Sequence, residues 1–180
     1  MKWLSSIFRK IGNRINSPQG QEEADERIIE RLRSKGIQIG KGCRIYTTEF
    51  STEPFLVTIG DNVAISGSAK ILTHNGAARL LKARRPMIQS FGKVIIESDC
   101  FIGECAVVLP GTRIGRGSII GAGAVVRGHI PENSLVVGNP AQIIGRASLF
   151  LERLDKSSDT LDTFGLDEQT RKTLILAHFS

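Results

Sequence analysis

Aliphatic residues recur every six positions along the middle of this chain. A small residue lies four positions after most of them, and glycine often follows them directly. From residue 96 onwards the aliphatic series is Ile96, Ile102, Val108, Ile114, Ile120 and Val126, and the small residues are Cys100, Ala106, Thr112, Ser118 and Ala124. Six is not a multiple of the 3.6-residue helical turn, and the long alternating strands of a hairpin sheet are missing. The repeat therefore predicts short strands joined by tight corners.

A three-sided parallel β-helix accounts for this period. Each hexapeptide would supply one strand and one corner, and three of them would form a coil of about 18 residues that stacks on the next at ~4.8 Å. The aliphatic residues would fill the interior of this prism. The series also runs earlier, through Ile39, Ile45, Ile59, Ile65 and Ile71, with two extra residues before Ile59. It then stops until Ile96, which predicts an excursion loop over about residues 75–92.

The repeat divides the chain into three parts. We expect an all-β solenoid domain over residues 37–146, with helical extensions over residues 1–36 and 147–180. Turn residues at 17–20 predict a linker, and Gly36 marks the end of an expected helix over 21–35. Helices are also expected after the prism, over 148–155 and 167–178, the second capped by Asp167.

Residues 1–16 form an amphipathic pattern with basic residues and no acid on the polar side. The apolar stripe consists of Trp3, Leu4, Ile7, Phe8, Ile11 and Ile15. Such a helix could lie on an anionic membrane surface. Packing on the prism or on a neighbouring subunit is the more common role of such a helix, and the sequence leaves both interpretations open.

Charge and cysteine content limit the class of protein. The net charge is +6, but interleaved aromatic residues and a basic reading helix are missing from the central region, so we do not expect a nucleic-acid partner. The three cysteines are odd in number and follow no zinc spacing. With no secretory cleavage site and no apolar run of ~20 residues, the sequence predicts a cytoplasmic protein, with peripheral membrane contact through residues 1–16 as an option.

His74 stands where the six-residue rhythm stops. It lies three residues after the inward-facing Ile71, at a corner, so its side chain should point away from the core beside a loop that can wall a cleft. One coil below, allowing for the insertion, stands Glu53, whose carboxylate could accept the Nδ1 proton and leave Nε2 free as a general base. Glu49 or a backbone carbonyl are alternative partners. His129 and His178 are too far away in the sequence to complete a zinc site, so no metal is expected.

The motifs around these residues resemble a known family. The T-H-N-G corner, the stretch D-C-F-I-G-E-C-A-V-V-L-P-G-T-R-I-G and the closing I-P-E-N-S-L-V-V-G-N-P-A are similar to hexapeptide-repeat acyltransferases. The likeness is to sugar O-acetyltransferases of the maltose/galactoside type and their relatives in lipopolysaccharide and capsule synthesis. It implies a left-handed parallel β-helix, a homotrimer with active sites between neighbouring prisms, and acetyl-CoA as the acyl donor.

The same resemblance assigns residues to the site. It implies that His74 is the general base and that donor contacts come from Gly103, Glu104, Ala122, Arg127, Gly128, Asn139, Pro140, Gln142 and Arg146. This chain departs from the family at Asn75, where many relatives have Asp, and at Phe101, where Trp is common. The charge of Glu104 is a third departure, which fits only a contact with the neutral pantetheine arm.

The expected activity is therefore acetyl-CoA-dependent O-acetylation of a sugar hydroxyl in a surface polysaccharide or its precursor. An N-acetyltransferase acting on an amino sugar linked to a nucleotide is the main alternative, because an amine can attack the same thioester. A non-catalytic trimeric scaffold is the alternative from a different class, since solenoids often serve as binding surfaces.

Overall fold

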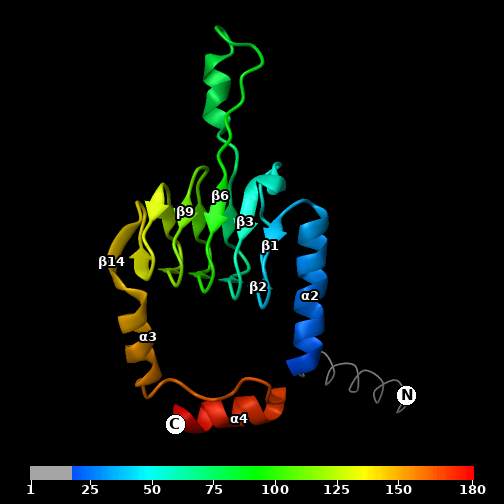
Figure 1. The fold of residues 1–180 in the computed structure, drawn as a ribbon. Coiled ribbons are helices and arrows are strands. Elements are labelled where there is room, and N and C mark those ends of the chain that lie inside the picture. Colours follow the sequence, from blue (N-terminus) through cyan, green and yellow to red (C-terminus); the bar gives the residue numbers. More distant parts are fainter. Residues whose placement is uncertain (1–17) are drawn as a thin grey trace, which may run out of the picture.

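A parallel β-helix forms the centre of the molecule, as the sequence predicts (Figure 1). The computed structural model describes residues 18–180. Three sheets form the three faces of the prism, in the orders β1-β3-β6-β9-β12, β2-β4-β7-β10-β13-β14 and β5-β8-β11. The first face consists of β1 (Gln38–Ile39), β3 (Val57–Ile59), β6 (Val94–Ile96), β9 (Arg113–Ile114) and β12 (His129–Ile130). The second consists of β2 (Arg44–Ile45), β4 (Ala64–Ile65), β7 (Phe101–Ile102), β10 (Ile119–Ile120), β13 (Ser134–Val137) and β14 (Gln142–Arg146), and the third of β5 (Lys70–Ile71), β8 (Val107–Val108) and β11 (Val125–Val126).

The repeating residues fill the prism. Strand register aligns aliphatic residues of successive coils, as in Ile65 opposite Ile102 and Ile102 opposite Ile120. Nearly all of the aliphatic residues of the series are buried, and the small residues Cys100, Ala106, Thr112, Ser118 and Ala124 are buried beside them. Burial at about 25 cal/mol per Å² of apolar surface makes this column the main source of stability. The predicted core is confirmed.

One corner of the prism requires left-handed backbone in every coil. Between the first and second faces, a positive φ recurs at Gly42, Asn62, Asp99, Gly117 and Asn133. Glycine, asparagine and aspartate are the residues that adopt this conformation most readily, which explains why only these three types occupy the position. The residue types found at this corner in each coil therefore agree with the coil boundaries that the six-residue period predicts.

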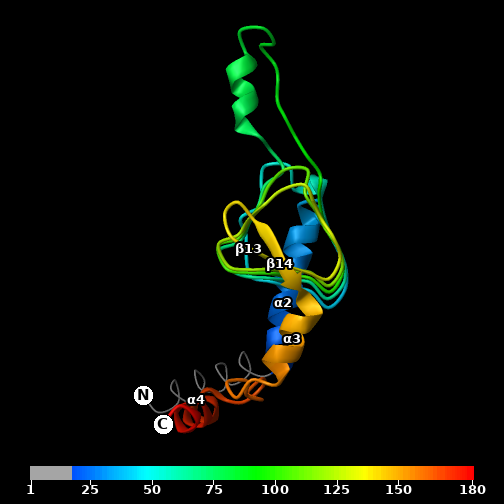
Figure 2. The same cartoon turned by 90° about the vertical axis from the view of Figure 1, so that its left-hand side faces the viewer.

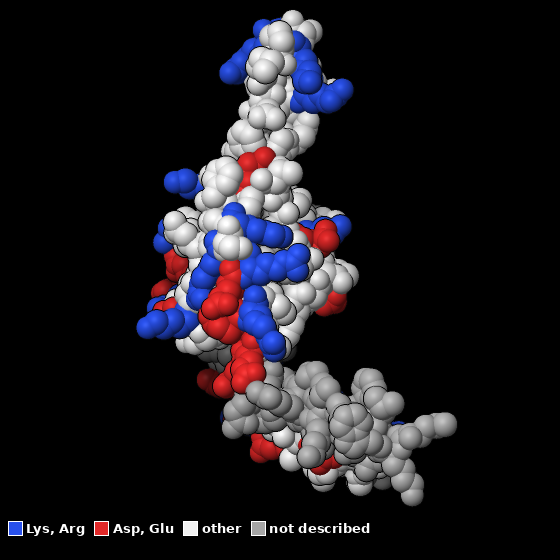
Figure 3. Space-filling model, turned by 90° about the vertical axis from the view of Figure 1, so that its right-hand side faces the viewer, with Lys and Arg blue, Asp and Glu red and all other residues white. Residues whose placement is uncertain are grey.

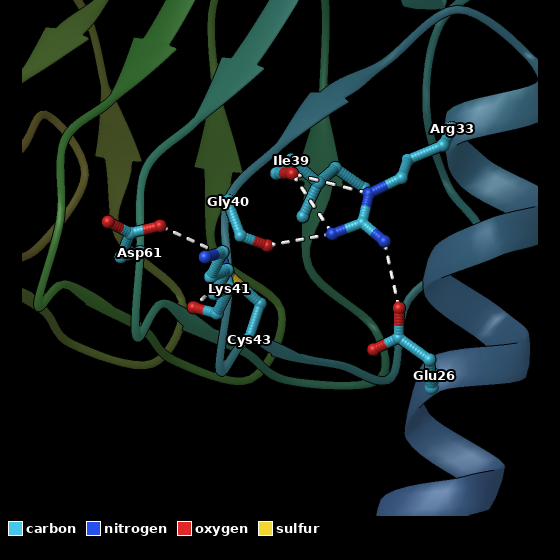
Figure 4. Close-up of polar contacts among 7 residues, drawn as sticks. All are labelled: Glu26, Arg33, Ile39, Gly40, Lys41, Cys43 and Asp61. Atoms are coloured by element: carbon cyan, nitrogen blue, oxygen red, sulfur yellow. Dashed lines mark hydrogen bonds and ion pairs between the residues drawn. The ribbon is translucent and has the colours of Figure 1, made fainter.

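Helix α2 (Pro18–Ser34) covers the first end of the prism. Ile29 and Leu32 are buried in the core from this helix. Arg33 donates to the carbonyls of Ile39, at 3.1 and 3.3 Å, and Gly40, at 2.9 Å, and forms an ion pair with Glu26 (Figure 4). The guanidinium therefore satisfies carbonyls at the start of the first coil. The predicted linker is wrong for residues 18–20, because they belong to α2, and Pro18 is a residue well suited to a first helical turn.

The other end is closed by a strand that the repeat does not predict. Strand β14 reverses direction and pairs antiparallel with β13. In the turn between them, Gly138 O accepts from Val125 N and Ala141 N donates to Val125 O, so this turn also covers the end of β11. Helix α3 (Ala147–Asp155) follows, and α4 (Glu168–His178) begins at Asp167, whose carboxylate accepts from the backbone N–H groups of Gln169 and Thr170. Both helices, and the Asp167 cap, confirm the sequence predictions.

The excursion stands out from one corner of the prism (Figures 1 and 2). It contains the 3₁₀ helix η2 (Gly76–Leu81), and a shorter one, η1 (Pro54–Leu56), lies at the same corner one coil earlier. The base of the excursion is pinned, because His74 bridges to Phe91, Asn75 N donates to Ser90 O, and Gly92 N donates to Thr73 O. The first turn of the excursion therefore has a defined position relative to the prism.

The prediction for residues 1–16 lies outside the described part of the chain. Within residues 18–180, none of the helices combines the length and apolar character needed to cross a bilayer. The same range holds no group of three or more His, Cys, Asp or Glu side chains arranged to bind a metal.

Candidate active site

His74 lies at the corner between the third and first faces, where the chain leaves β5 for the excursion. Its side chain is 32% exposed. The Nδ1 atom is buried without a hydrogen-bond partner among the described residues, and it lies 3.6 Å from Oε1 of Glu53. The Phe91 ring contacts the imidazole edge to face, with ring centroids 5.2 Å apart. One ring nitrogen is thus directed towards a carboxylate while the side chain remains partly open to solvent.

Glu53 is held in place by two threonines. Thr52 Oγ1 donates to Oε1 of Glu53 at 2.6 Å, and Thr73 Oγ1 lies 3.3 Å from Oε2. The hydrogen bond from Thr52 is the main cause that keeps the pKa of Glu53 below its ordinary value, with smaller contributions from Thr73 and from nearby His74. The carboxylate is therefore charged at neutral pH, which suits a group that orients an imidazole and stabilises its protonated form.

Of the three candidate partners predicted for His74, the structure places only Glu53 close to the imidazole. Glu49 is exposed and forms no ion pair with His74, and no backbone carbonyl among the described residues accepts from Nδ1. Thr52, Thr73 and Phe91 were not predicted. Thr73 is fully buried directly before His74, so its polar side chain in a core position was a signal that could have pointed to a role at this corner.

Two pockets share His74, Asn75 and Gly76. The first, of about 400 Å³, extends along the prism and is completed by Leu72, Leu109, Pro110 and Arg127. The second, of about 200 Å³, is lined by His74 and by residues of the excursion itself, including Arg79 and Lys82. A larger pocket of about 670 Å³ lies elsewhere, between Tyr46 and the segment before α4, and contains none of the predicted site residues. The imidazole therefore separates two pockets of different composition.

The predicted donor contacts fall at two different corners. Arg127 and Gly128 follow β11 and share the corner of His74. Between the second and third faces lie Gly103, Glu104, Ala122, Asn139 and Pro140, while Gln142 and Arg146 belong to β14. A whole face of the prism separates the two groups. The residues predicted to contact the donor therefore form two groups, here called half-sites, which do not face each other within one chain.

Two residues of the second group have structural contacts. Gly103 is buried, and a Cβ there would lie 2.6 Å from the backbone nitrogen of Ala122, so glycine permits the stacking of two coils. Glu104 accepts from the backbone N–H of Ser68 at 3.0 Å. This bond directs the carboxylate along the stack towards the coil below, and Ala122 stays exposed at the corner.

Comparison with known proteins defines the family. The description "Bacterial transferase hexapeptide (six repeats)" matches residues 93–128. Protein CapG of Staphylococcus aureus is 31% identical over 143 residues, which cover 78% of this chain and 83% of CapG. This chain belongs to the hexapeptide-repeat acyltransferase family.

Further family members agree with this assignment. A protein of Escherichia coli named "Putative lipopolysaccharide biosynthesis O-acetyl transferase WbbJ" is 39% identical over 98 residues, and the match spans 49% of each chain. A solved hexapeptide-repeat-containing acetyltransferase from Vibrio cholerae superposes with a TM-score of 0.56 at 30% identity, covering 62% of this chain and 63% of that chain. The left-handed β-helix and the acyltransferase class predicted from the sequence are thereby confirmed.

Proposed function

We propose that this protein transfers an acetyl group from acetyl-CoA to a sugar hydroxyl, with His74 as the general base. One observation carries the proposal: Nδ1 of His74 is buried against the Glu53 carboxylate at 3.6 Å, while the same side chain lines two separate pockets. A general base in acetyl transfer must reach the acceptor hydroxyl on one side and lie close to the donor thioester on the other, so it has to border two pockets. The name of WbbJ supports an acceptor in surface polysaccharide synthesis.

The chemistry requires one proton transfer and one acyl transfer. Nε2 takes the proton of the acceptor hydroxyl, the oxygen forms a bond to the thioester carbon, and the carbon–sulfur bond breaks. The thiolate of CoA then recovers the proton from the imidazolium. Glu53 stabilises the imidazolium while it exists, because its charge faces Nδ1. Neither a metal nor a covalent enzyme intermediate takes part in these steps.

The pocket along the prism suits the donor. Leu72, Leu109 and Pro110 offer apolar surface to the uncharged pantetheine arm, and Arg127 offers a positive charge to a phosphate. The acetyltransferase names of WbbJ and of the Vibrio protein support acetyl-CoA as the donor.

A homotrimer with shared sites is the assembly that fits these half-sites. The corner of His74 in one subunit would face the corner of Ala122 in the next, which joins the groups that a single chain holds apart. Uncovered apolar surface supports such association. Ala64, Phe101, Ile119 and Leu135 form a row across the outer side of the second face, and Phe101 is 43% exposed. Leu151 and Leu154 of α3 are about half exposed as well.

Acetyl-CoA, mixed with a panel of neutral, acidic and amino sugars, tests the proposal. We expect free CoA thiol to appear with a sugar hydroxyl as acceptor, and mass spectrometry should find an acetyl ester on the product. An amide on an amino sugar would instead identify the N-acetyltransferase. If none of the sugars raises thiol release above the background rate of acetyl-CoA hydrolysis, the result would favour a non-catalytic scaffold.

Glu53→Gln tests the orienting carboxylate. The change keeps the size of the side chain but removes the charge that faces Nδ1, so kcat should fall about tenfold or more, while the KM for acetyl-CoA stays close to wild type. Glu49→Gln is the matched control, since Glu49 lies nearby in the sequence, is exposed and forms no ion pair with His74. Equal kcat values for wild type and Glu53→Gln would reduce Glu53 to a structural role.

A further inference from the structure

The excursion carries positive charge and no negative charge. Residues 74–93 contain no Asp or Glu, and the excursion itself contributes Arg79, Lys82, Arg84 and Arg85. Figure 3 shows basic side chains gathered on its outer part. The ion pairs found within residues 18–180 involve none of these four side chains. Their charges are therefore available to a ligand.

Two of the four basic residues line the smaller pocket beside the candidate base. In a 3₁₀ helix, residues three positions apart lie above one another, so the row Gly76, Arg79 and Lys82 runs along one side of η2. All three line the 200 Å³ pocket with His74, whereas Arg84 and Arg85 do not. The row starts at the pinned base of the excursion, where Asn75 caps η2 by accepting from Ala77 N at 3.0 Å. The two cations thus lie on the segment that directly follows the base, on η2 and at its end.

The small pocket and the prism pocket differ in what they can bind. Beyond the residues that the two pockets share, the prism pocket adds Leu72, Leu109, Pro110 and one cation, Arg127. The small pocket adds two cations, Arg79 and Lys82, with Gln89, Ala78 and Ile88. Its volume is below the roughly 300–1,000 Å³ of sites for drug-sized ligands, so it fits one sugar unit or one small anionic group. A cation pair beside a pocket of this size attracts and orients an anion.

We propose that the small pocket binds the acceptor and that this acceptor carries an anionic group, a phosphate or a carboxylate, that Arg79 and Lys82 contact. This inference rests on the proposed transfer to a sugar and specifies its substrate class. A phosphate would belong to a sugar phosphate or a phosphate-linked precursor, and a carboxylate to an acidic sugar. In both cases the anion anchors the sugar so that one hydroxyl reaches His74.

Calorimetric titration with three glucose-based probes tests the proposal: glucose, glucose 1-phosphate and glucuronic acid. The full-length protein is saturated with CoA, so that a phosphate probe cannot occupy the donor pocket. We expect glucose 1-phosphate or glucuronic acid to bind at least about tenfold more tightly than glucose, with an affinity that falls as salt is added. Whichever anion binds better identifies the source of the charge.

Two double variants localise the effect. Arg79→Gln/Lys82→Gln should abolish the preference for the anionic probe, whereas Arg84→Gln/Arg85→Gln removes the same net charge from the same excursion and should retain it. Equal binding of all three probes, no binding of either anion, or equal losses in the two double variants would overturn the inference. Thiol release with neutral sugars is measured in parallel, because normal release with no preference for anions refutes the inference and leaves the proposed activity intact.

Discussion

Replacing His74 by alanine is expected to lower kcat by about 10²–10⁴-fold, the usual contribution of a positioned general base. The loss corresponds to roughly 3–5 kcal/mol of transition-state stabilisation. The side chain is partly exposed and contacts Phe91 only edge to face, so its truncation should leave the prism folded. Thiol release from acetyl-CoA under saturating acceptor measures the effect, and circular dichroism with light scattering verifies fold and assembly.

The other two histidines provide controls for this variant. His129 is exposed on β12 and His178 lies in α4, both away from the pockets around His74. His129→Ala and His178→Ala should keep turnover within about twofold of wild type, as is usual for surface substitutions without special contacts. A folded His74→Ala protein with near-normal turnover would contradict the assignment of the base.

Two inactive variants are expected to restore activity when they assemble together. His74→Ala removes the base from one half-site, and Ala122→Trp should block donor binding at the other corner, where Ala122 is exposed. If each active site combines the His74 corner of one subunit with the Ala122 corner of the next, a mixed trimer contains an intact pair. Each mixed trimer, of composition 2:1 or 1:2, should then hold one intact site among its three, so the mixed assemblies should recover about a third of wild-type activity per trimer.

Coexpression with two different affinity tags, followed by purification on both, isolates the mixed assemblies. Each variant purified alone should remain inactive, which is the matched control. Mixed assemblies without activity, or an active monomer in light scattering, would mean that a single chain holds the complete site.

The six-residue period was enough to predict the coil and its core, because the aliphatic position is constrained by the interior of the prism. The period also located the excursion, since a segment that leaves the stack has no interior to fill. Strand β14 escaped prediction for the opposite reason: it reverses direction and all of its residues are exposed, so its sequence has no inward position that recurs. The start of α2 at Pro18 was missed because proline and glycine were interpreted as a linker.

The candidate site was predictable only in part. Stacking of coils indicated that Glu53 and His74 are neighbours, because residues of successive coils lie one strand spacing apart. The contacts of Thr52 and Thr73 with Glu53 depend on side-chain rotamers, which no period encodes. The predicted donor residues lie at two corners because of the strand order. In the proposed assembly, the two groups would meet only between two copies of the chain.

The closed ends of the prism determine how copies of this chain can associate. A stack of parallel coils is an open template, and an uncovered last coil would accept another chain end to end and continue into a fibre. Here α2 covers one end through Ile29, Leu32 and Arg33, and the turn into β14 covers the other. Growth along the axis is thereby blocked. In the proposed trimer, copies would therefore meet side by side, through lateral faces and corners, and a closed ring would limit their number.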